Sequence, residues 1–265
     1  MSAEMKKILL RCACILPVIL ALVIVMAVVG SRPAKPTEPP PYTLPPSPYT
    51  PEDFYFEGDY LACYKAEVSL GIDVSHHQGA IDWQKVADAG VEFAIIRLGY
   101  RGLTGGALHT DDRMVENLQG ARAAGLKVGA YFYSQAVSVE EARQEAAYAL
   151  ELLGDTALEL PLVFDWEQEK RTENVPISVA TACAVAFCEE VSAAGYQPMV
   201  YFNGYQAKNL MDMEQLEGYP WWLAMYDIRA EFPCRMDIWQ YSCTGSIPGI
   251  QGNVDLNLRF PEETV

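Results

Sequence analysis

Residues 160–167 read Leu-Pro-Leu-Val-Phe-Asp-Trp-Glu, an apolar run that ends in two acids one residue apart. The run predicts a buried β-strand, and alternate side chains of a strand point to the same face. Two strand steps of ~3.3 Å would place the β-carbons of Asp165 and Glu167 roughly 6–7 Å apart. Acids held in this way, with a further acid supplied from elsewhere, are suited to glycosidic bond cleavage. Two acids at a solvated strand end would give the same local pattern.

Strand-like runs and helical patterns alternate along most of the chain. The predicted strands are 68–74, 93–100, 127–134, 160–167, 198–203, 221–226, 237–241 and 254–260. The predicted helices are 82–89, 111–124, 138–153 and 178–194. Such alternation predicts a parallel sheet. Eight strands favour an α/β fold, a modified TIM-type (β/α) barrel of mostly parallel strands with reduced helices in its C-terminal half. An open doubly wound sheet is the alternative, although no glycine-rich phosphate motif follows the first strand.

Polar side chains gather at the carboxyl ends of these predicted strands, where barrel enzymes act. The candidate catalytic acids are Asp73, Asp165, Glu167 and Asp255. The candidate substrate-binding residues are Tyr100, Tyr131, Tyr133, Tyr201, Asn203, Tyr226, Asp227 and Gln240. Acids that are distant in sequence and meet at one rim are hard to explain by solvation alone. For the aromatic residues, core packing is the competing interpretation.

The pair His76-His77 raises the question of a metal site. Neighbouring side chains on extended backbone point in opposite directions, so this pair is poorly placed to chelate one ion. The sequence contains one further histidine, His109. We therefore expect no metal ion and no cofactor.

The N-terminal segment has the composition of a membrane segment. Lys6, Lys7 and Arg11 precede an uncharged apolar stretch of 19 residues, 12–30. At 1.5 Å per residue such a stretch can span a hydrocarbon core of ~30 Å, and the basic residues before it orient the N-terminus inside. We expect 1–31 to be a cytoplasmic stub with a transmembrane signal-anchor. A cleaved signal peptide is the alternative, although its apolar core usually has ~7–15 residues.

A proline-rich stretch separates this segment from the rest of the chain. Residues 32–51 hold nine of the 17 prolines, which predicts an extended, semi-rigid, extracytoplasmic linker. We expect residues 52–265 to form one catalytic domain. This range carries 14 Lys and Arg against 33 Asp and Glu. Such acidity argues against nucleic acid or anionic lipid as its ligand, because both need a basic surface.

Taken together, the motifs resemble those of the glycoside hydrolase family 25 lysozymes. The matching segments are 71–75, 78–79, 93–100, 129–133, 165–167, 222–227, 239–241 and 253–257. They occur in the family's order and extend over residues 68–260. The resemblance implies an N-acetylmuramidase that cuts the β-1,4 bond between N-acetylmuramic acid and N-acetylglucosamine in peptidoglycan. We therefore expect an extracytoplasmic monomer whose partner is the glycan strand and which contacts the membrane only through its apolar segment.

The resemblance also assigns roles to the four acids. Glu167 matches the general acid, whose pKa must be raised by burial or by neighbouring carboxylates. Asp165 matches the residue that supports participation of the substrate's 2-acetamido group, and a direct displacement by activated water is the alternative route. Asp73 and Asp255 match positions that line the sugar subsite. Because all four acids are present, an inactive peptidoglycan-binding module is the less favoured interpretation. The lack of a longer run of alternating aspartates before Glu167 weighs against a glycosidase for chitin-like chains.

Overall fold

The computed structural model describes residues 42–261. The predictions for the apolar segment and for most of the proline-rich linker lie outside the described residues. Within 42–261, no helix combines the length and the apolar character that crossing a membrane would require. The unit that carries the barrel is Thr43–Val265.

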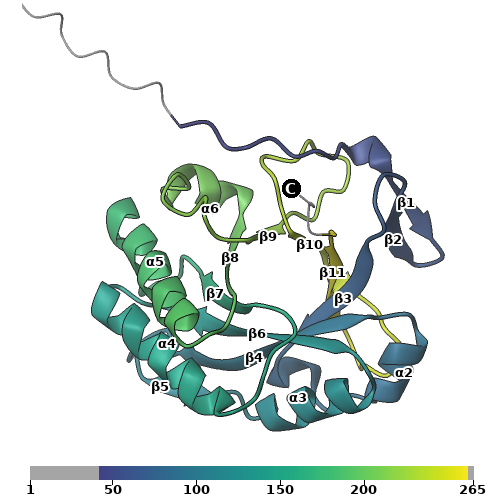
Figure 1. The fold of residues 1–265 in the computed structure, drawn as a ribbon, viewed down its shortest axis with the longest axis horizontal. Coiled ribbons are helices and arrows are strands. Elements are labelled where there is room, and N and C mark those ends of the chain that lie inside the picture. The colour runs from purple at the N-terminus through teal and green to yellow at the C-terminus, as the bar shows by residue number, and fades with distance from the viewer. Residues whose placement is uncertain (1–41, 262–265) are drawn as a thin grey trace, which may run out of the picture. The chain divides into compact units, whose positions relative to one another are not determined.

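Eight strands of the described chain close into a barrel (Figure 1). Their order around the ring is β3 (Ser69–Val74), β11 (Val254–Arg259), β10 (Ile238–Gly245), β9 (Trp221–Ala224), β8 (Pro198–Asn203), β7 (Leu162–Trp166), β6 (Lys127–Ser134) and β4 (Phe93–Arg101). Parallel pairing of β4 with β3 closes the ring. Within this ring, β11 is antiparallel to both of its neighbours, and the other pairs are parallel. The predicted barrel of eight mostly parallel strands is confirmed.

The C-terminal half of the barrel carries less helix than the N-terminal half, as predicted. The first four barrel strands are followed by α2 (Trp83–Asp88), α3 (Met114–Ala123), α4 (Val139–Leu153) and α5 (Ile177–Ala193). After β8 the described chain forms one short helix, α6 (Gly204–Asn209). The side chains of Asp82 and Ser138 accept hydrogen bonds from the backbone amides at the starts of α2 and α4, which fixes where these helices begin.

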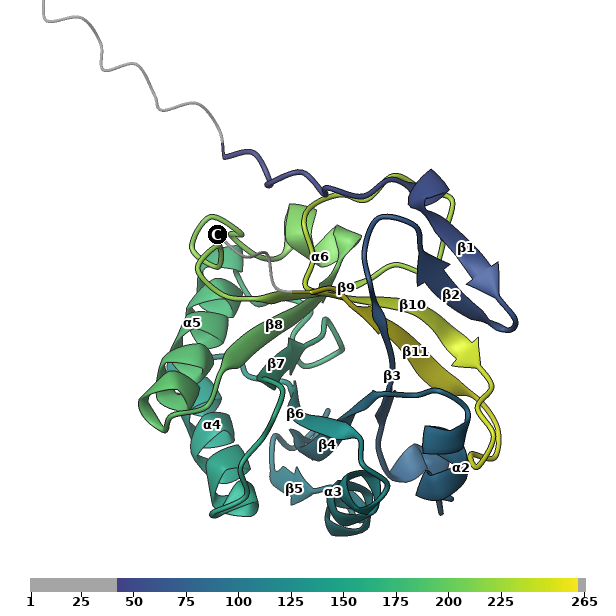
Figure 2. The same cartoon turned by 45° about the vertical axis from the view of Figure 1, so that its right-hand side comes forward.

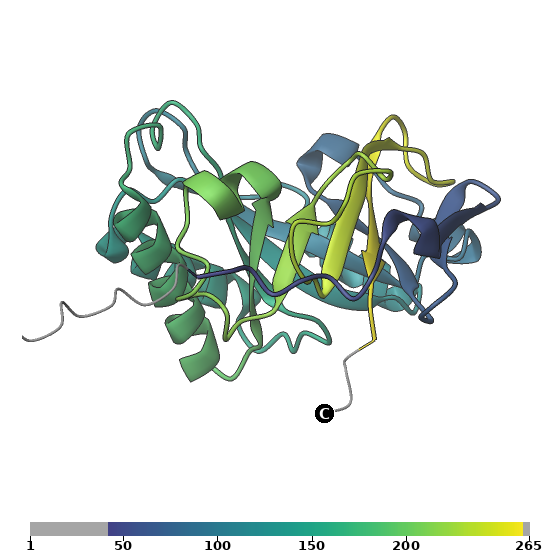
Figure 3. The same ribbon diagram turned by 90° about the horizontal axis from the view of Figure 1, so that it is seen from above.

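Several short elements were not predicted. Strands β1 (Phe54–Glu57) and β2 (Tyr60–Cys63) form an antiparallel hairpin ahead of the barrel, and β5 (Leu108–Thr110) pairs with β4. Viewed from above, the hairpin and the α4–α5 helix pair lie on opposite sides of the barrel (Figure 3). The ring of Phe54 packs edge-on against Trp239 of β10, with centroids 5.0 Å apart. The hairpin is therefore attached to the barrel wall.

The last residues of the proline-rich stretch contact the barrel unit. The Tyr49 ring stacks on Phe260 with centroids 4.5 Å apart. The backbone amide of Arg235 donates a hydrogen bond of 2.8 Å to the carbonyl of Pro45. The compact unit accordingly begins at Thr43. A domain boundary at 51/52 remains a prediction.

Apolar side chains fill the end of the barrel interior where the parallel strands begin. Polar groups occupy the end where these strands finish. Phe93 and Ile95 of β4 point into this core, and strand alternation then places Arg97 on the same inner face. Gly71 provides the space for Phe93, because a β-carbon at residue 71 would lie 2.2 Å from the Phe93 ring. Along β4, the apolar core therefore extends to Ile95 and the polar residues begin at Arg97.

Candidate active site

Two of the predicted acids face each other across one strand pair. In the antiparallel register of β3 and β11, Asp255 lies directly opposite Asp73. Asp73 is near the carboxyl end of β3, whereas Asp255 is near the amino end of β11. Had β11 been parallel to its neighbours, Asp255 would lie at the opposite end of the barrel. The reversed direction of β11 is therefore what brings this acid to the rim.

A hydrogen-bond network holds the Asp73 carboxylate. The side-chain amides of Gln240 and Asn257 each donate a bond of 2.8 Å to Asp73 Oδ2. The hydroxyls of Tyr201 and Tyr226 donate to Gln240 Oε1 at 3.0 and 2.8 Å. Because the Gln240 carbonyl already accepts two bonds, its NH₂ group is the one that faces Asp73. The position of Asp73 is thus set directly by side chains of two other strands, β10 and β11.

Burial and the closeness of the two carboxyl groups make it unfavourable for Asp73 and Asp255 to be charged together. Burial and the nearby Asp255 charge raise the pKa of Asp73 to about 8, while the amides of Asn257 and Gln240 oppose the rise. Burial raises the pKa of Asp255 to about 6, and its hydrogen bond with Asp73 works in the opposite direction. Between these two values the pair holds one proton.

Asp165 is a buried acid, as Asp73 is. It lies on β7, next to Tyr133 of β6 and Tyr201 of β8 in the sheet register, and its side chain is 7% exposed. Its Oδ1 atom is buried and makes no hydrogen bond to the protein. Burial, followed by the charges of Glu167 and Asp73, raises its pKa well above the ordinary value. A carboxyl group in this state is ready to bond a polar group of a ligand.

Glu167 follows β7 directly and is half-buried. Its backbone carbonyl accepts hydrogen bonds from Gln135 Nε2 at 2.9 Å and from Thr172 Oγ1 at 2.8 Å. These bonds fix the backbone from which the Glu167 side chain projects. Burial, and then the charges of Glu169 and Asp255, raise the pKa of Glu167. Such a carboxyl group keeps its proton to higher pH, as a general acid requires.

Trp166, the residue between Asp165 and Glu167, is also held in place by hydrogen bonds. Trp166 is buried, and its indole N–H donates to the carbonyl of Ala136 at 2.9 Å. Its own carbonyl accepts a bond of 2.6 Å from Gln206 of α6. Helix α6, which was not predicted, therefore supports the segment that carries both acids.

The four acids share one cavity of about 270 Å³ at the carboxyl ends of the parallel strands. Five of the eight predicted substrate-binding residues line it as well: Tyr131, Tyr133, Tyr201, Tyr226 and Gln240. Carboxyls from β3, β7 and β11 thus meet at one site, together with aromatic and amide groups. That combination can donate a proton, stabilise positive charge and contact the faces of a sugar.

Three predicted substrate-binding residues lie outside this cavity. The Tyr100 ring stacks on His109, with centroids 5.0 Å apart. Asn203 begins α6, and its side chain accepts the amides of Tyr205 and Gln206. Asp227 accepts the amide of Arg229 at 3.1 Å. Each of these side chains has a local structural partner in place of a position at the rim.

The list of candidate site residues omits several residues that line the cavity. Arg97 lines the cavity, and its guanidinium bonds to Asp111 Oδ2 through Nε at 2.9 Å. A single cation inside the apolar run 93–100 was the available signal, because buried charges are rare unless they are paired. Asn257 follows Asp255 by two residues, and this spacing already placed it on the same face of the strand. Ser75, His77, Gln78 and Trp222 also line the cavity.

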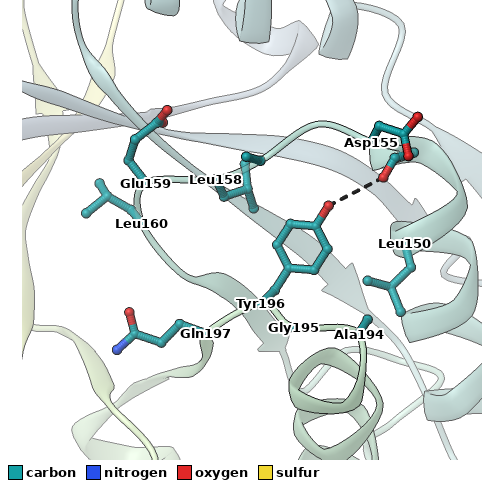
Figure 4. Close-up of a pocket in the computed structure, with 11 residues that line it drawn as sticks. Leu150, Asp155, Leu158, Glu159, Leu160, Ala194, Gly195, Tyr196 and Gln197 are labelled. Carbon is teal, nitrogen blue, oxygen red and sulfur yellow. Dashed lines mark hydrogen bonds between the residues drawn. The ribbon is translucent and has the colours of Figure 1, made fainter.

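Another cavity, of about 650 Å³, lies at the amino ends of β7 and β8 (Figure 4). Its lining comes from the turns that follow α4 and α5, and the Tyr196 hydroxyl donates to the carbonyl of Thr156 at 2.9 Å. In barrels of this type the amino-terminal face supports stability, whereas chemistry occurs at the opposite face. The acidic cavity is therefore the candidate active site.

Comparison with known proteins identifies the class. The sequence matches glycosyl hydrolases family 25 over residues 72–250. The chain belongs to this family, as the motifs predicted. It is 27% identical over 211 residues to Lysozyme M1 of Streptomyces globisporus, a match that covers 71% of this chain and 66% of that protein.

Solved structures show the same barrel. The bacterial lysozyme from Streptomyces coelicolor superposes with a TM-score of 0.63 at 26% identity, over 74% of this chain and 93% of that chain. The modular autolysin LytC from Streptococcus pneumoniae, solved in complex with a synthetic peptidoglycan ligand, has a TM-score of 0.62 at 26% identity. That match covers 73% of this chain and 47% of LytC, so this chain spans about half the length of the autolysin.

Proposed function

We propose that this chain is a peptidoglycan hydrolase of the muramidase type. It would cut the β-1,4 bond between N-acetylmuramic acid and N-acetylglucosamine. Family membership and the likeness to Lysozyme M1 and the autolysin LytC support this proposal. The observation that carries it is the meeting of Asp73, Asp165, Glu167 and Asp255 in one cavity.

In this proposal Glu167 is the general acid that protonates the leaving oxygen of the glycosidic bond. Its raised pKa supports the role, because the side chain must carry a proton near neutral pH. Its position supports the role too, since it lies at the rim of the cavity and its backbone is fixed by Gln135 and Thr172. The proton would pass from the Glu167 carboxyl to the departing sugar oxygen.

Asp165 is proposed to orient the substrate's 2-acetamido group. Its buried Oδ1 has no partner within the protein, and an acetamide N–H is a donor of the right kind to supply one. Held in this way, the acetamide oxygen would attack the anomeric carbon while the bond to the leaving group breaks. Direct attack by water activated at an aspartate is the alternative route. The two routes predict opposite anomers of the first product, which proton NMR during turnover distinguishes.

Asp73 and Asp255 are proposed to bind the sugar and to stabilise the positive charge that develops on its ring. The one proton that the pair holds near neutral pH leaves one negative charge beside the reaction centre. The amides of Gln240 and Asn257 keep Asp73 in place for this role. Water would then attack the anomeric carbon, its bond to the acetamide oxygen would break, and the Glu167 carboxylate would accept the proton of that water. These groups and water would complete the hydrolysis without a metal or other cofactor.

Mass analysis of the products tests the proposal. A muramidase releases muropeptides that end in reducing N-acetylmuramic acid, whereas cleavage of the other glycosidic bond would leave reducing N-acetylglucosamine. An inactive binding module would retain peptidoglycan without releasing fragments. A chitin-directed enzyme would release sugars from chitin oligomers faster than from peptidoglycan. Only the first result agrees with the proposal.

We further propose that the catalytic unit acts outside the cytoplasm as a monomer, tethered to the membrane by residues 12–30. The uncharged apolar stretch and the basic residues before it support this placement. The mass of the full-length protein in isolated membranes tests it. An intact N-terminus in the membrane fraction agrees with an anchor, and a chain that starts near residue 31 in the medium contradicts it.

A further inference from the structure

A second groove adjoins the acidic cavity. It has a volume of about 830 Å³ and lies between the β1–β2 hairpin, the outer end of β10 and the loop that leads to β11. Figure 2 shows the hairpin standing beside the ends of β10 and β11. Tyr226 lines both hollows, so the groove adjoins the candidate active site. The groove is lined by Phe56, Asp59, Tyr60, Tyr226, Thr244 and Ser246, among others.

The groove presents aromatic rings to solvent. Phe56 is 58% exposed and Tyr226 is 50% exposed, although large aromatic side chains are usually buried. Phe54, on the same strand as Phe56, is anchored against Trp239. The Tyr60 hydroxyl donates to the carbonyl of Ser246 at 3.4 Å. The hairpin is thus held at both of its strands, and its exposed rings have fixed places beside the groove.

The charge of the lining limits what the groove can bind. Asp59 is the one charged residue among its lining side chains, and no Lys or Arg takes part. A ligand with free carboxylates, such as a peptidoglycan stem peptide, would find no cation there. An uncharged N-acetylated sugar fits better, because its ring faces can stack on aromatic side chains and its hydroxyls can bond to serine, threonine and backbone oxygens.

We propose that this groove is an additional sugar-binding subsite, built by the β1–β2 hairpin, that holds the uncharged N-acetylglucosamine units of the same glycan strand beyond the acidic cavity. The inference rests on the proposed function and deepens it, since it makes the enzyme prefer long strands. The hairpin precedes residue 72, where the family match begins. The hairpin side of the subsite therefore lies outside the matched range, and the opposite side lies mostly within it.

The test uses the full chain and peptide-free glycan strands separated into short oligosaccharides and long strands. We expect the double variant Phe56→Ala/Tyr60→Ala to lower the ratio of kcat/KM for long over short substrates by about threefold to tenfold, because each lost ring contact weakens binding modestly. Tyr64→Ala is the matched control. Tyr64 is exposed and stacks on Tyr55 but does not line the groove, so this variant should keep the wild-type ratio. An unchanged ratio in the double variant overturns the inference.

A binding measurement separates this inference from the proposed function. Affinity for long peptide-free strands is compared between Glu167→Gln and the same variant that also carries Phe56→Ala/Tyr60→Ala. Weaker binding by the latter supports the subsite even if the wild-type chain hydrolyses nothing, a result that would overturn the muramidase proposal alone. Equal binding overturns the subsite. A hairpin effect seen only on strands that retain stem peptides would show a peptide occupant and would also overturn it.

Discussion

Gln240 donates its side-chain amide to Asp73 Oδ2 at 2.8 Å, although the two residues are 167 positions apart. They lie on β10 and β3, which are separated in the ring by β11. The bond therefore passes over β11 in the wall of the candidate active site. Because Gln240 also accepts from Tyr201 and Tyr226, one amide group ties together four parts of the chain.

Gln240→Leu should lower both stability and activity. The substitution leaves Asp73 without one donor and two tyrosine hydroxyls without an acceptor, and unsatisfied buried groups cost about 1–3 kcal/mol each. We expect the free energy of unfolding to fall by at least about 1 kcal/mol in urea denaturation. Gln84→Leu on the exposed surface of α2 is the control and should change it by less than about 0.5 kcal/mol. Equal stability of the two variants would show that the network contributes nothing.

The pH dependence of hydrolysis should report the charges around Glu167. A general acid must be protonated, so the rate should fall as pH rises through the pKa of Glu167. Burial raises that pKa most, and the charge of Glu169 adds to it. Glu169→Gln removes this charge, and we expect the alkaline limb of the kcat/KM profile to move to lower pH. Because Glu169 is exposed, the displacement should shrink in high salt.

Glu173→Gln serves as the control for that experiment. Glu173 is exposed in the same loop and does not line the acidic cavity. The alkaline limb of the kcat/KM profile of Glu173→Gln should coincide with that of the wild type. Movement of the limb to higher pH in Glu169→Gln would contradict the assigned electrostatics.

Burial of Asp73 should make folding less stable as the solution becomes alkaline. Its pKa rises from 3.8 to about 8 on folding, chiefly through burial and the charge of Asp255. The folded state therefore binds the proton more tightly, and the free energy of unfolding should fall as pH rises between these values. Asp73→Asn cannot ionise, and its carbonyl can still accept from Gln240 and Asn257.

We accordingly expect the difference in unfolding free energy between pH 5 and pH 8 to be smaller for Asp73→Asn than for the wild type. Urea denaturation at the two pH values measures it. The variant should also be less active, since the cavity loses a carboxylate. A variant whose stability depends on pH as steeply as that of the wild type would assign the pH dependence to other groups.

The barrel strands were predictable because the apolar runs, the side-chain alternation and the helix caps all indicate the same elements. Phe93, Ile95 and Arg97 alternate on β4, and capping side chains mark the starts of α2 and α4. The β1–β2 hairpin was not predicted, because its strands have four residues each and Leu61 is their one buried residue. Short strands of this kind give too few repeats for the period to emerge.

The acids of the candidate site were predictable from the sequence. The substrate-binding residues around them were less so. Asp165 and Glu167 were readable from one strand end. The rim position of Asp255 depends on the antiparallel direction of β11, which no local pattern encodes. Tyr100 and Asn203 had the right residue type near a strand end, yet ring stacking and helix capping occupy their side chains. Only tertiary contacts separate such local roles from contact with a ligand.

The rate at which the full-length Glu167→Gln variant releases reducing ends from purified peptidoglycan tests the central claim most directly. The substitution keeps the shape of the side chain and removes its transferable proton. A fall of about 10²–10⁴-fold relative to the wild type is predicted, with Glu173→Gln retaining wild-type release. Wild-type release by Glu167→Gln would contradict the account, because the proposed general acid would then have no part in the reaction.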